Sequence, residues 1–227
     1  MVVDKHRHLP WACTYDDTLA PQQPAYLSAY DLGTGALTAS YVMPGESGFC
    51  NDVTLDDEGN VYATDSFANT IVRLPDGGDA LENWATSDAF ADEPWAITLN
   101  GIEFDGHDRL YVVKSSTGEL FSVRIKADGS AGAPRAITVN PPLEMPDGLE
   151  IAGDGTLVIV ENTGSVASVD LCGSSGQKSV LAGGLLEPTT AAIHRGSAWV
   201  VEGQLSLLFS GGDPSLPFRV KRVALDE

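Results

Sequence analysis

The chain alternates apolar and polar positions in a motif that recurs four times. Each copy begins with a polar residue, continues as an alternating segment, turns at Gly or Asp, and ends in a second apolar segment. The copies are NDVTLDDEGNVYATD from Asn51, NGIEFDGHDRLYVVK from Asn100, DGLEIAGDGTLVIVE from Asp147 and TTAAIHRGSAWVVE from Thr189. Alternation with a period of two indicates half-buried strands, and a short turn between two such strands predicts a β-hairpin.

A third apolar segment follows each hairpin, as in TIVRLPDGG, ELFSVRIKADGSAG and SVASVDLCGSSG. Weaker fourth segments follow in ALENWATSD and PRAITVN. Four antiparallel strands about every 45 residues are typical of the blades of a β-propeller. A β-sandwich also has many short strands, but it would not keep the motif in phase over four copies. Because no segment keeps a period of 3.6 residues, we predict an all-β propeller with almost no helix.

The repeat divides the single predicted domain, residues 1–227, into five blade units. Their approximate ranges are 1–46, 47–92, 93–140, 141–186 and 187–227. In the first unit, LPWACTYDD matches a second strand, and the polar residue that would begin its first strand falls before Met1. In the last unit, PFRVKRVAL matches a third strand without a fourth. We therefore predict a propeller of the six-bladed type that is incomplete at its N-terminus, with about five four-stranded units present.

We call the residues that begin the four copies the anchor residues: Asn51, Asn100, Asp147 and Thr189. The innermost strands of a propeller run along a central channel, so equivalent positions on them converge near its axis. Amide, carboxylate and hydroxyl oxygens are hard ligands that suit Ca²⁺ or Mg²⁺, and a set without His or Cys argues against zinc. Asn and Asp are also common turn residues, so each could instead shape a loop. Their common register, at spacings of 49 and 47 residues for the first three, favours a metal site.

The second strands end at another series of equivalent positions, which we call the strand-end residues: Thr14, Asp65, Lys114, Glu161 and Glu202. If they face the channel mouth, Lys114 lies among acids and could serve in proton transfer. The alternative, which we favour, is that they are ordinary polar residues at the ends of strands. No H-E-x-x-H zinc motif includes any of the four histidines, His6, His8, His107 and His194.

Charge narrows the choice of partners. The chain has 13 Lys and Arg residues against 32 Asp and Glu, a net charge of −19, which repels nucleic acid and anionic membrane surfaces. No apolar run approaches the roughly 18 residues that span a bilayer, and the segment after Met1 has no apolar signal-peptide core.

The three cysteines, Cys13, Cys50 and Cys172, form no C-x-x-C pair. We expect buried free thiols, although a Cys13–Cys50 disulfide is possible.

Three short motifs carry a family resemblance. F-C-N-D-V, L-N-G-I and P-D-G-L-E resemble the N-D, N-G and P-D-G motifs of the SMP-30/gluconolactonase/LRE-like family of metal-dependent hydrolases, and the resemblance extends over nearly the whole chain from about Trp11. It implies that Asn51, Asn100 and Asp147 bind a catalytic divalent cation, Ca²⁺ or another ion such as Mg²⁺, Mn²⁺ or Zn²⁺. It also implies that Asp147 is the general base.

Two features depart from the family pattern. The fourth ligand of the family, a Glu from its first blade, has no counterpart in this chain. Phe49 and Cys50 stand where some members carry a basic residue that contacts the substrate. The substrate therefore cannot be transferred from the family to this chain.

Three functions are compatible with these observations. The first is a metal-dependent hydrolase of the lactonase or ester-hydrolase type, in which a divalent cation in the central channel activates water for attack on a small-molecule substrate. The second is a non-catalytic or degenerate propeller that acts as a binding module. The third is a propeller that resembles strictosidine synthase and uses a different channel acid, Glu161 or Glu202.

Overall fold

The computed structural model describes residues 1–15, 24–45, 48–94 and 96–225, and their regular structure is almost entirely β-strand. The strands form five successive blades. Blades 1 and 2 contain β1 (Val2–Asp4), β2 (Leu9–Tyr15), β3 (Ala25–Tyr30), β4 (Leu37–Val42), β5 (Cys50–Leu55), β6 (Val61–Asp65), β7 (Thr70–Leu74) and β8 (Glu82–Thr86). Blade 3 contains β9 (Leu99–Phe104), β10 (Arg109–Lys114), β11 (Glu119–Arg124) and β12 (Arg135–Asn140). Blades 4 and 5 contain β13 (Pro146–Ile151), β14 (Leu157–Glu161), β15 (Ser165–Cys172), β16 (Ser175–Gly183), β17 (Pro188–Ile193), β18 (Ser197–Glu202) and β19 (Arg219–Ala224).

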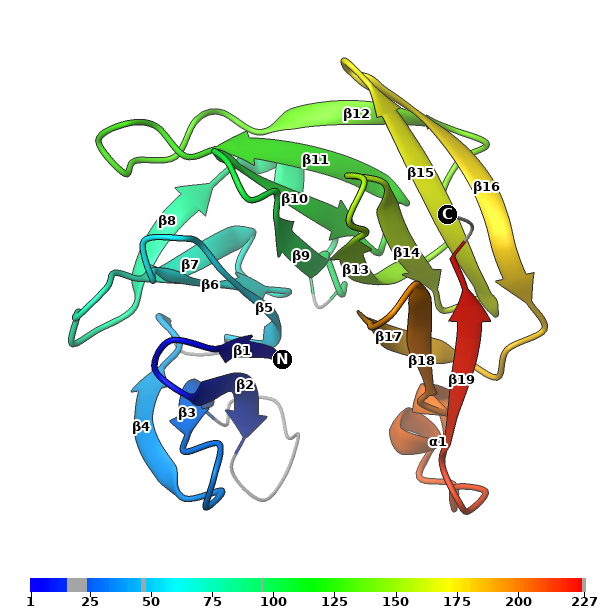
Figure 1. The fold of residues 1–227 in the computed structure, drawn as a ribbon, viewed down its shortest axis with the longest axis horizontal. Coiled ribbons are helices and arrows are strands. Elements are labelled where there is room, and N and C mark those ends of the chain that lie inside the picture. The colour runs from blue at the N-terminus through cyan, green and yellow to red at the C-terminus, as the bar shows by residue number, and fades with distance from the viewer. Residues whose placement is uncertain (16–23, 46–47, 95, 226–227) are drawn as a thin grey trace.

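Within each blade the strands are antiparallel and follow sequence order from the centre outward. Figure 1 shows the blades as an arc around a centre, with β5, β9, β13 and β17 innermost and a gap in the ring between blades 1 and 5. The outer strands β12 and β16 also pair with each other in parallel, which joins blades 3 and 4 into one eight-stranded sheet. The predicted all-β propeller is therefore confirmed, while the six-bladed type stays a prediction.

Four apolar clusters fill the spaces between successive blades. Leu27 of blade 1 packs in one cluster with Val53 of blade 2, and the next cluster joins blades 2 and 3. The third cluster joins blades 3 and 4, and the last contains Val160 of blade 4 and Ala198 of blade 5. Because a blade has two faces, each inner blade buries apolar side chains on both, which explains why short strands such as β14 are buried along their whole length.

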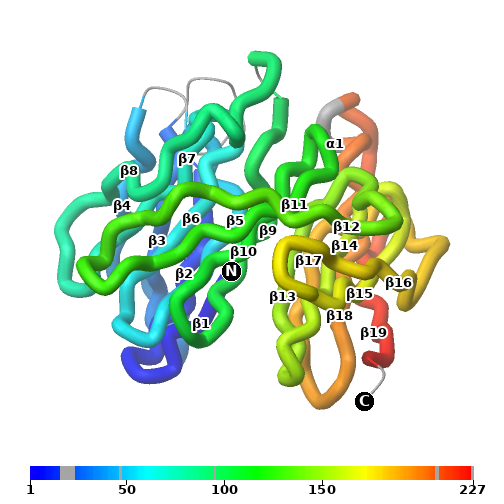
Figure 2. Tube along the Cα trace, turned by 90° about the horizontal axis from the view of Figure 1, so that it is seen from above, coloured from blue at the N-terminus to red at the C-terminus, as the bar shows by residue number. Residues whose placement is uncertain are grey.

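Helix is nearly absent from the described residues, as predicted. The described helices are one 3₁₀ turn, η1 (Asp88–Phe90), and the short helix α1 (Leu205–Ser210). Viewed edge-on, α1 lies at one rim of the ring and the end of β19 lies toward the other (Figure 2). In the described part of the chain, no helix is long and apolar enough to cross a membrane.

The expectation of buried free thiols is wrong. Cys13 on β2 and Cys50 on β5 form a disulfide, with their Cα atoms 5.3 Å apart. The cause is that β2 and β5 belong to neighbouring blades that pack together at this level, so residues 37 positions apart meet. Cys172 is free but exposed, because it lies at the end of β15 beside the turn into β16.

Candidate functional site

Each anchor residue lies in a β-bulge, which the sequence pattern did not reveal. On β13, Pro146 pairs with Glu161 and Leu149 pairs with Ile159, so Asp147 and Gly148 together oppose a single residue of β14. Strands β5, β9 and β17 show the same two-against-one irregularity at Asn51, Asn100 and Thr189. A bulge re-aims a side chain out of the regular alternation of a strand. This geometry turns the four anchor residues toward one central space.

Glycine after the anchor allows the inner strands to approach each other. A Cβ atom on Gly101 would lie 2.4 Å from the carbonyl oxygen of Asp147, and one on Gly148 would lie 2.7 Å from Cα of Thr190. Both distances are too short for real atoms, so the second residue of each of these bulges must lack a side chain. The glycines of the N-G and D-G motifs therefore bring the anchor residues of neighbouring blades together.

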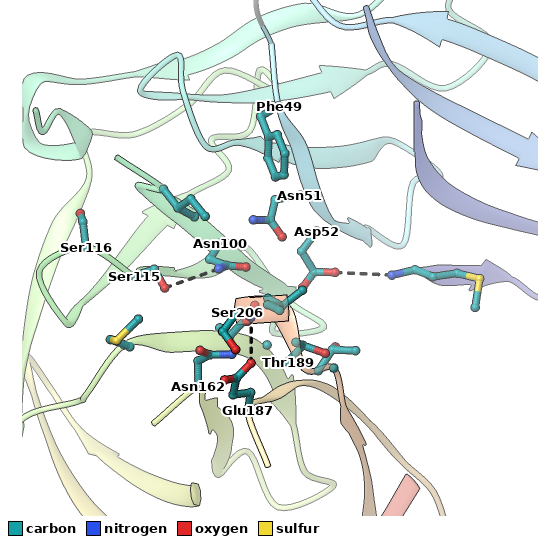
Figure 3. Close-up of a pocket in the computed structure, with 18 residues that line it drawn as sticks. Phe49, Asn51, Asp52, Asn100, Ser115, Ser116, Asn162, Glu187, Thr189 and Ser206 are labelled. Carbon is teal, nitrogen blue, oxygen red and sulfur yellow. Dashed lines mark hydrogen bonds and ion pairs between the residues drawn. The ribbon is translucent and has the colours of Figure 1, made fainter. Parts of the chain in front are cut away.

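The anchor residues line a cavity of about 840 Å³ at the centre of the ring (Figure 3). Its other polar lining includes the side chains of Asp52, Ser115, Asn162, Glu187 and Ser206. Three of the lining residues are carboxylic acids, and among the described residues that line the cavity none is Lys, Arg or His. The amino group of Met1 lies 3.5 Å from Asp52 Oδ1. The side chains of the cavity therefore present an acidic surface.

Serine side chains orient the two anchor amides. Asn51 Nδ2 donates to Ser66 Oγ at 3.0 Å, and Asn100 Nδ2 donates to Ser115 Oγ at 3.5 Å. Ser66 and Ser115 in turn donate to backbone carbonyl groups of the next blade, at 2.6 Å in both cases. In Figure 3 the Asn100 nitrogen faces Ser115 and its oxygen faces the other way. This arrangement presents amide oxygens, which are suitable ligands for a hard cation.

The positions of these serines also follow the repeat, although the sequence analysis missed them. Ser66, Ser115 and Asn162 each come directly after a strand-end residue. Asn162 Nδ2 donates to the carbonyl oxygen of Pro188 at 3.2 Å, so it links blade 4 to blade 5 as the serines link the earlier blades. The signal that could have revealed them is their constant offset of fifteen residues from the anchor.

Asp147 is the titratable side chain among the three predicted ligands, and its pKa is strongly raised. Burial, and next the negative charge of Asp52, raise the pKa of Asp147 to about 7, and a hydrogen bond from Asn100 only partly opposes them. Burial followed by neighbouring carboxylates also raises the pKa of Glu150 to about 7 and that of Glu103 to about 8. These acids on β9 and β13 all feel the negative charge of Asp52, so negative charge is poorly compensated in this region. A divalent cation is the kind of partner that such a set would favour.

Two of the strand-end residues, Asp65 and Glu202, bind backbone groups outside the central cavity. Asp65 Oδ1 accepts from the backbone N–H of Phe49 at 3.0 Å, and Glu202 Oε1 accepts from that of Leu186 at 2.9 Å. One oxygen of each of these acids, Asp65 Oδ2 and Glu202 Oε2, has no hydrogen-bond partner among the described residues. Neither residue lines the cavity. Their contacts hold the segment that leads into the inner strand of the same blade.

The other strand-end residues, Glu161, Lys114 and Thr14, also make hydrogen bonds or ion pairs within the fold. Glu161 accepts from the backbone N–H of Glu144 at 2.6 Å and pairs with Lys178 Nζ at 2.8 Å. Lys114 Nζ donates to the carbonyl oxygen of Ala91 at 2.8 Å. Thr14 shares a hydrogen bond with Ser28 at 2.7 Å. None of the strand-end residues lines the central cavity, which favours their interpretation as ordinary structural residues over a role in proton transfer.

The donor set decides which kind of ion could fit. In the described residues, no three His, Cys, Asp or Glu side chains are grouped so that they could hold a metal ion. An ion at the anchor residues would therefore depend on the amide oxygens of Asn51 and Asn100 together with the Asp147 carboxylate. Such a set, with one partly buried carboxylate and two amide oxygens, fits a hard cation such as Ca²⁺ better than zinc.

Searches with family models and among curated proteins found no match. Solved structures match instead, at low identity. A virginiamycin B lyase from Staphylococcus aureus has 15% identity and a TM-score of 0.58, over 81% of this chain and 60% of that one. A luciferin-regenerating enzyme has 14% identity and a TM-score of 0.66, over 95% of this chain and 77% of that one. A gluconolactonase from Xanthomonas campestris has 19% identity and a TM-score of 0.57, over 79% of this chain and 65% of that one.

These likenesses establish the fold of the chain. It is similar to proteins that span more residues, since it covers 60% of the lyase and 65% of the gluconolactonase. At such identities the comparison supports a β-propeller and leaves activity to be argued from the site.

Proposed function

We propose that this chain is a metal-dependent hydrolase of the lactonase or ester-hydrolase type, with a divalent cation, Ca²⁺ in the first instance, held by Asn51, Asn100 and Asp147. The observation that carries the proposal is that β-bulges turn Asn51, Asn100 and Asp147 into one acidic cavity, whose described lining includes no Lys, Arg or His. The enzymes of similar fold include a gluconolactonase, which agrees with this class of reaction.

The cavity has a suitable size for a small molecule. Its volume of about 840 Å³ falls in the usual range for small-molecule sites, roughly 300–1,000 Å³. Phe49 and Leu205 provide apolar lining beside the polar anchor residues. We therefore propose a small, uncharged or weakly charged ester or lactone as substrate, since the acidic lining would repel an anion.

Each site residue then has a chemical task. Asn51, Asn100 and Asp147 would hold the divalent cation, which would supply Lewis acidity for the hydrolysis. Asn51 and Asn100 supply neutral oxygens, so they do not weaken the positive charge of the ion. Asp147 would accept the proton of the attacking water. Its pKa is about 7 without the ion and would be lower with the ion bound, so the side chain would be ionised at neutral pH. Asp52 and Glu187 add carboxylates to the cavity that the repeat pattern did not predict.

The test compares Asp147→Asn with Asp154→Asn in calcium-dependent hydrolysis of a panel of lactones and esters. Asp154 is an exposed acid in the β13–β14 turn and serves as the matched control. We expect Asp147→Asn to lower kcat/KM about 10²–10⁴-fold, the usual contribution of a general base. Wild-type activity should rise with pH as the Asp147 carboxylate forms, with a midpoint below about 7, because bound Ca²⁺ would lower the ion-free pKa of Asp147.

Two outcomes would contradict the proposal. Equal rates in the two variants would remove Asp147 from the mechanism. Absence of turnover by the wild type on the whole panel, together with calorimetric binding of small molecules in the cavity, would favour the alternative of a non-catalytic binding module.

A further inference from the structure

A second pocket, of about 370 Å³, lies on blade 3 and has the opposite charge to the central cavity. Its lining includes four basic side chains, Arg109, Arg124, Lys126 and Arg135. They are four of the chain's 13 basic residues, in a molecule that carries 32 acidic ones. No acidic residue is among the described residues that line this pocket.

The register of the sheet brings the arginines together on one face. Arg109 of β10 stands directly opposite Arg124 of β11, and Ser122 of β11 stands opposite Arg135 of β12. Ser122 and Arg124 are two residues apart, so their side chains share a face. Like charges placed directly opposite each other destabilise a sheet. A pair of like charges that opposes folding is expected where the residues serve a function such as ligand binding.

Nearby carboxylates compensate only part of this charge. Asp108 lies 2.7 Å from Arg124 Nε and 3.5 Å from Arg109 Nε. In the described part of the chain, Arg135 and Lys126 form no ion pair, and Lys126 Nζ contacts Ser130 Oγ at 3.3 Å. The charge of Lys126 also acts on Asp128, so four cationic groups face two acids. At physiological salt the Debye length is about 8 Å, so these nearby groups determine the local potential more than the distant acids do.

The pocket is held in place from two sides. The β11–β12 loop is fixed at Gly129, whose carbonyl oxygen accepts from Arg73 at 2.6 Å and from Trp84 Nε1 at 2.8 Å. The backbone N–H of Gly132 donates to the carbonyl oxygen of Arg124 at 2.7 Å. A rigid loop reduces the ordering that a ligand would have to impose. The pocket is thus preorganised.

From these observations we infer that the blade 3 pocket binds a small multivalent anion of the phosphate type, such as inorganic phosphate or a phosphate monoester. Guanidinium groups bind phosphate oxygens through paired hydrogen bonds, and a dianion matches the excess of positive charge. The volume suits a small ligand. Arg109 begins β10, whereas Ser115, which lines the central cavity, follows the other end of that strand. The pocket is therefore separate from the central cavity and independent of the proposed hydrolysis.

The test is calorimetric titration of the intact protein with inorganic phosphate at constant ionic strength, in wild type, Arg135→Gln and Arg219→Gln. Arg219 is the matched control, because it is also an exposed arginine at the start of an outer strand. We expect saturable binding by the wild type, weakened roughly tenfold or more in Arg135→Gln and unchanged in Arg219→Gln. Acetate, a monoanion, should bind far more weakly than phosphate.

Equal phosphate affinity in the two variants, or no saturable binding by the wild type, would overturn the inference. Binding of an acidic peptide without binding of phosphate would also overturn it, by indicating a protein interface instead. Circular dichroism establishes that the variants are folded. If Arg135→Gln does not fold, Lys126→Gln replaces it with the same expected loss.

Discussion

Asp147 and Glu161 lie at the same level of blade 4, on paired strands, yet their surroundings differ in kind. Glu161 is bound by the Lys178 ammonium group, by a backbone N–H and by Ser165 Oγ. Asp147 faces an open acidic cavity, with burial and the charge of Asp52 acting against its ionised form. The comparison indicates that a carboxylate of the repeat is structural where the fold gives it an ion pair and hydrogen bonds. Where the fold gives it no such partners, the carboxylate is a candidate for function.

The largest expected difference between the two acids is in stability. Glu161→Gln would leave the buried Lys178 ammonium without its counter-ion, which typically costs about 3–5 kcal/mol of unfolding free energy. Asp147→Asn should cost little or even stabilise the protein, because it removes an ionised group that burial disfavours. Urea denaturation at pH 8 without divalent cations measures both effects.

The sign of the Asp147 effect depends on pH. The pKa of Asp147 is raised in the folded state, so the folded protein holds a proton that the unfolded chain releases. Wild-type stability should therefore fall as the pH rises from about 4 to about 7, and Asp147→Asn should show a flatter profile. Equal losses of stability in Glu161→Gln and Asp147→Asn would break the comparison, since it would mean that both carboxylates are structural.

A smaller effect concerns the bulge that aims Asp147. Gly148→Ala would place a methyl group against the backbone of Thr189 and Thr190, and such overpacking typically costs about 1–3 kcal/mol. Gly153→Ala, in the open turn of the same hairpin, is the control, because a methyl group there would meet no other atom within 4 Å. Thermal unfolding of both variants distinguishes them. If Gly148→Ala is as stable as Gly153→Ala, the close approach of β13 and β17 is not needed for the fold.

The repeat pattern predicted the fold well because alternation and turn residues act locally. The hairpins, the third strands and the common register of Asn51, Asn100 and Asp147 all follow from it. The cavity contributions of Asp52 and Glu187 could not be predicted, because they depend on bulges and on contacts between blades. The disulfide between Cys13 and Cys50 was missed as the preferred state for the same reason, since packing between blades brings the two residues together.

The most direct test of the central claim is an NMR titration of the Asp147 side-chain carboxyl carbon, without and with Ca²⁺. The account predicts a pKa of about 7 without the ion, and a clear fall when Ca²⁺ is added, because the ion stabilises the carboxylate. Asp154, whose pKa is lowered by hydrogen bonds from Thr156, should not respond. A pKa of Asp147 near its ordinary value, or one that is unchanged by Ca²⁺, would contradict the account.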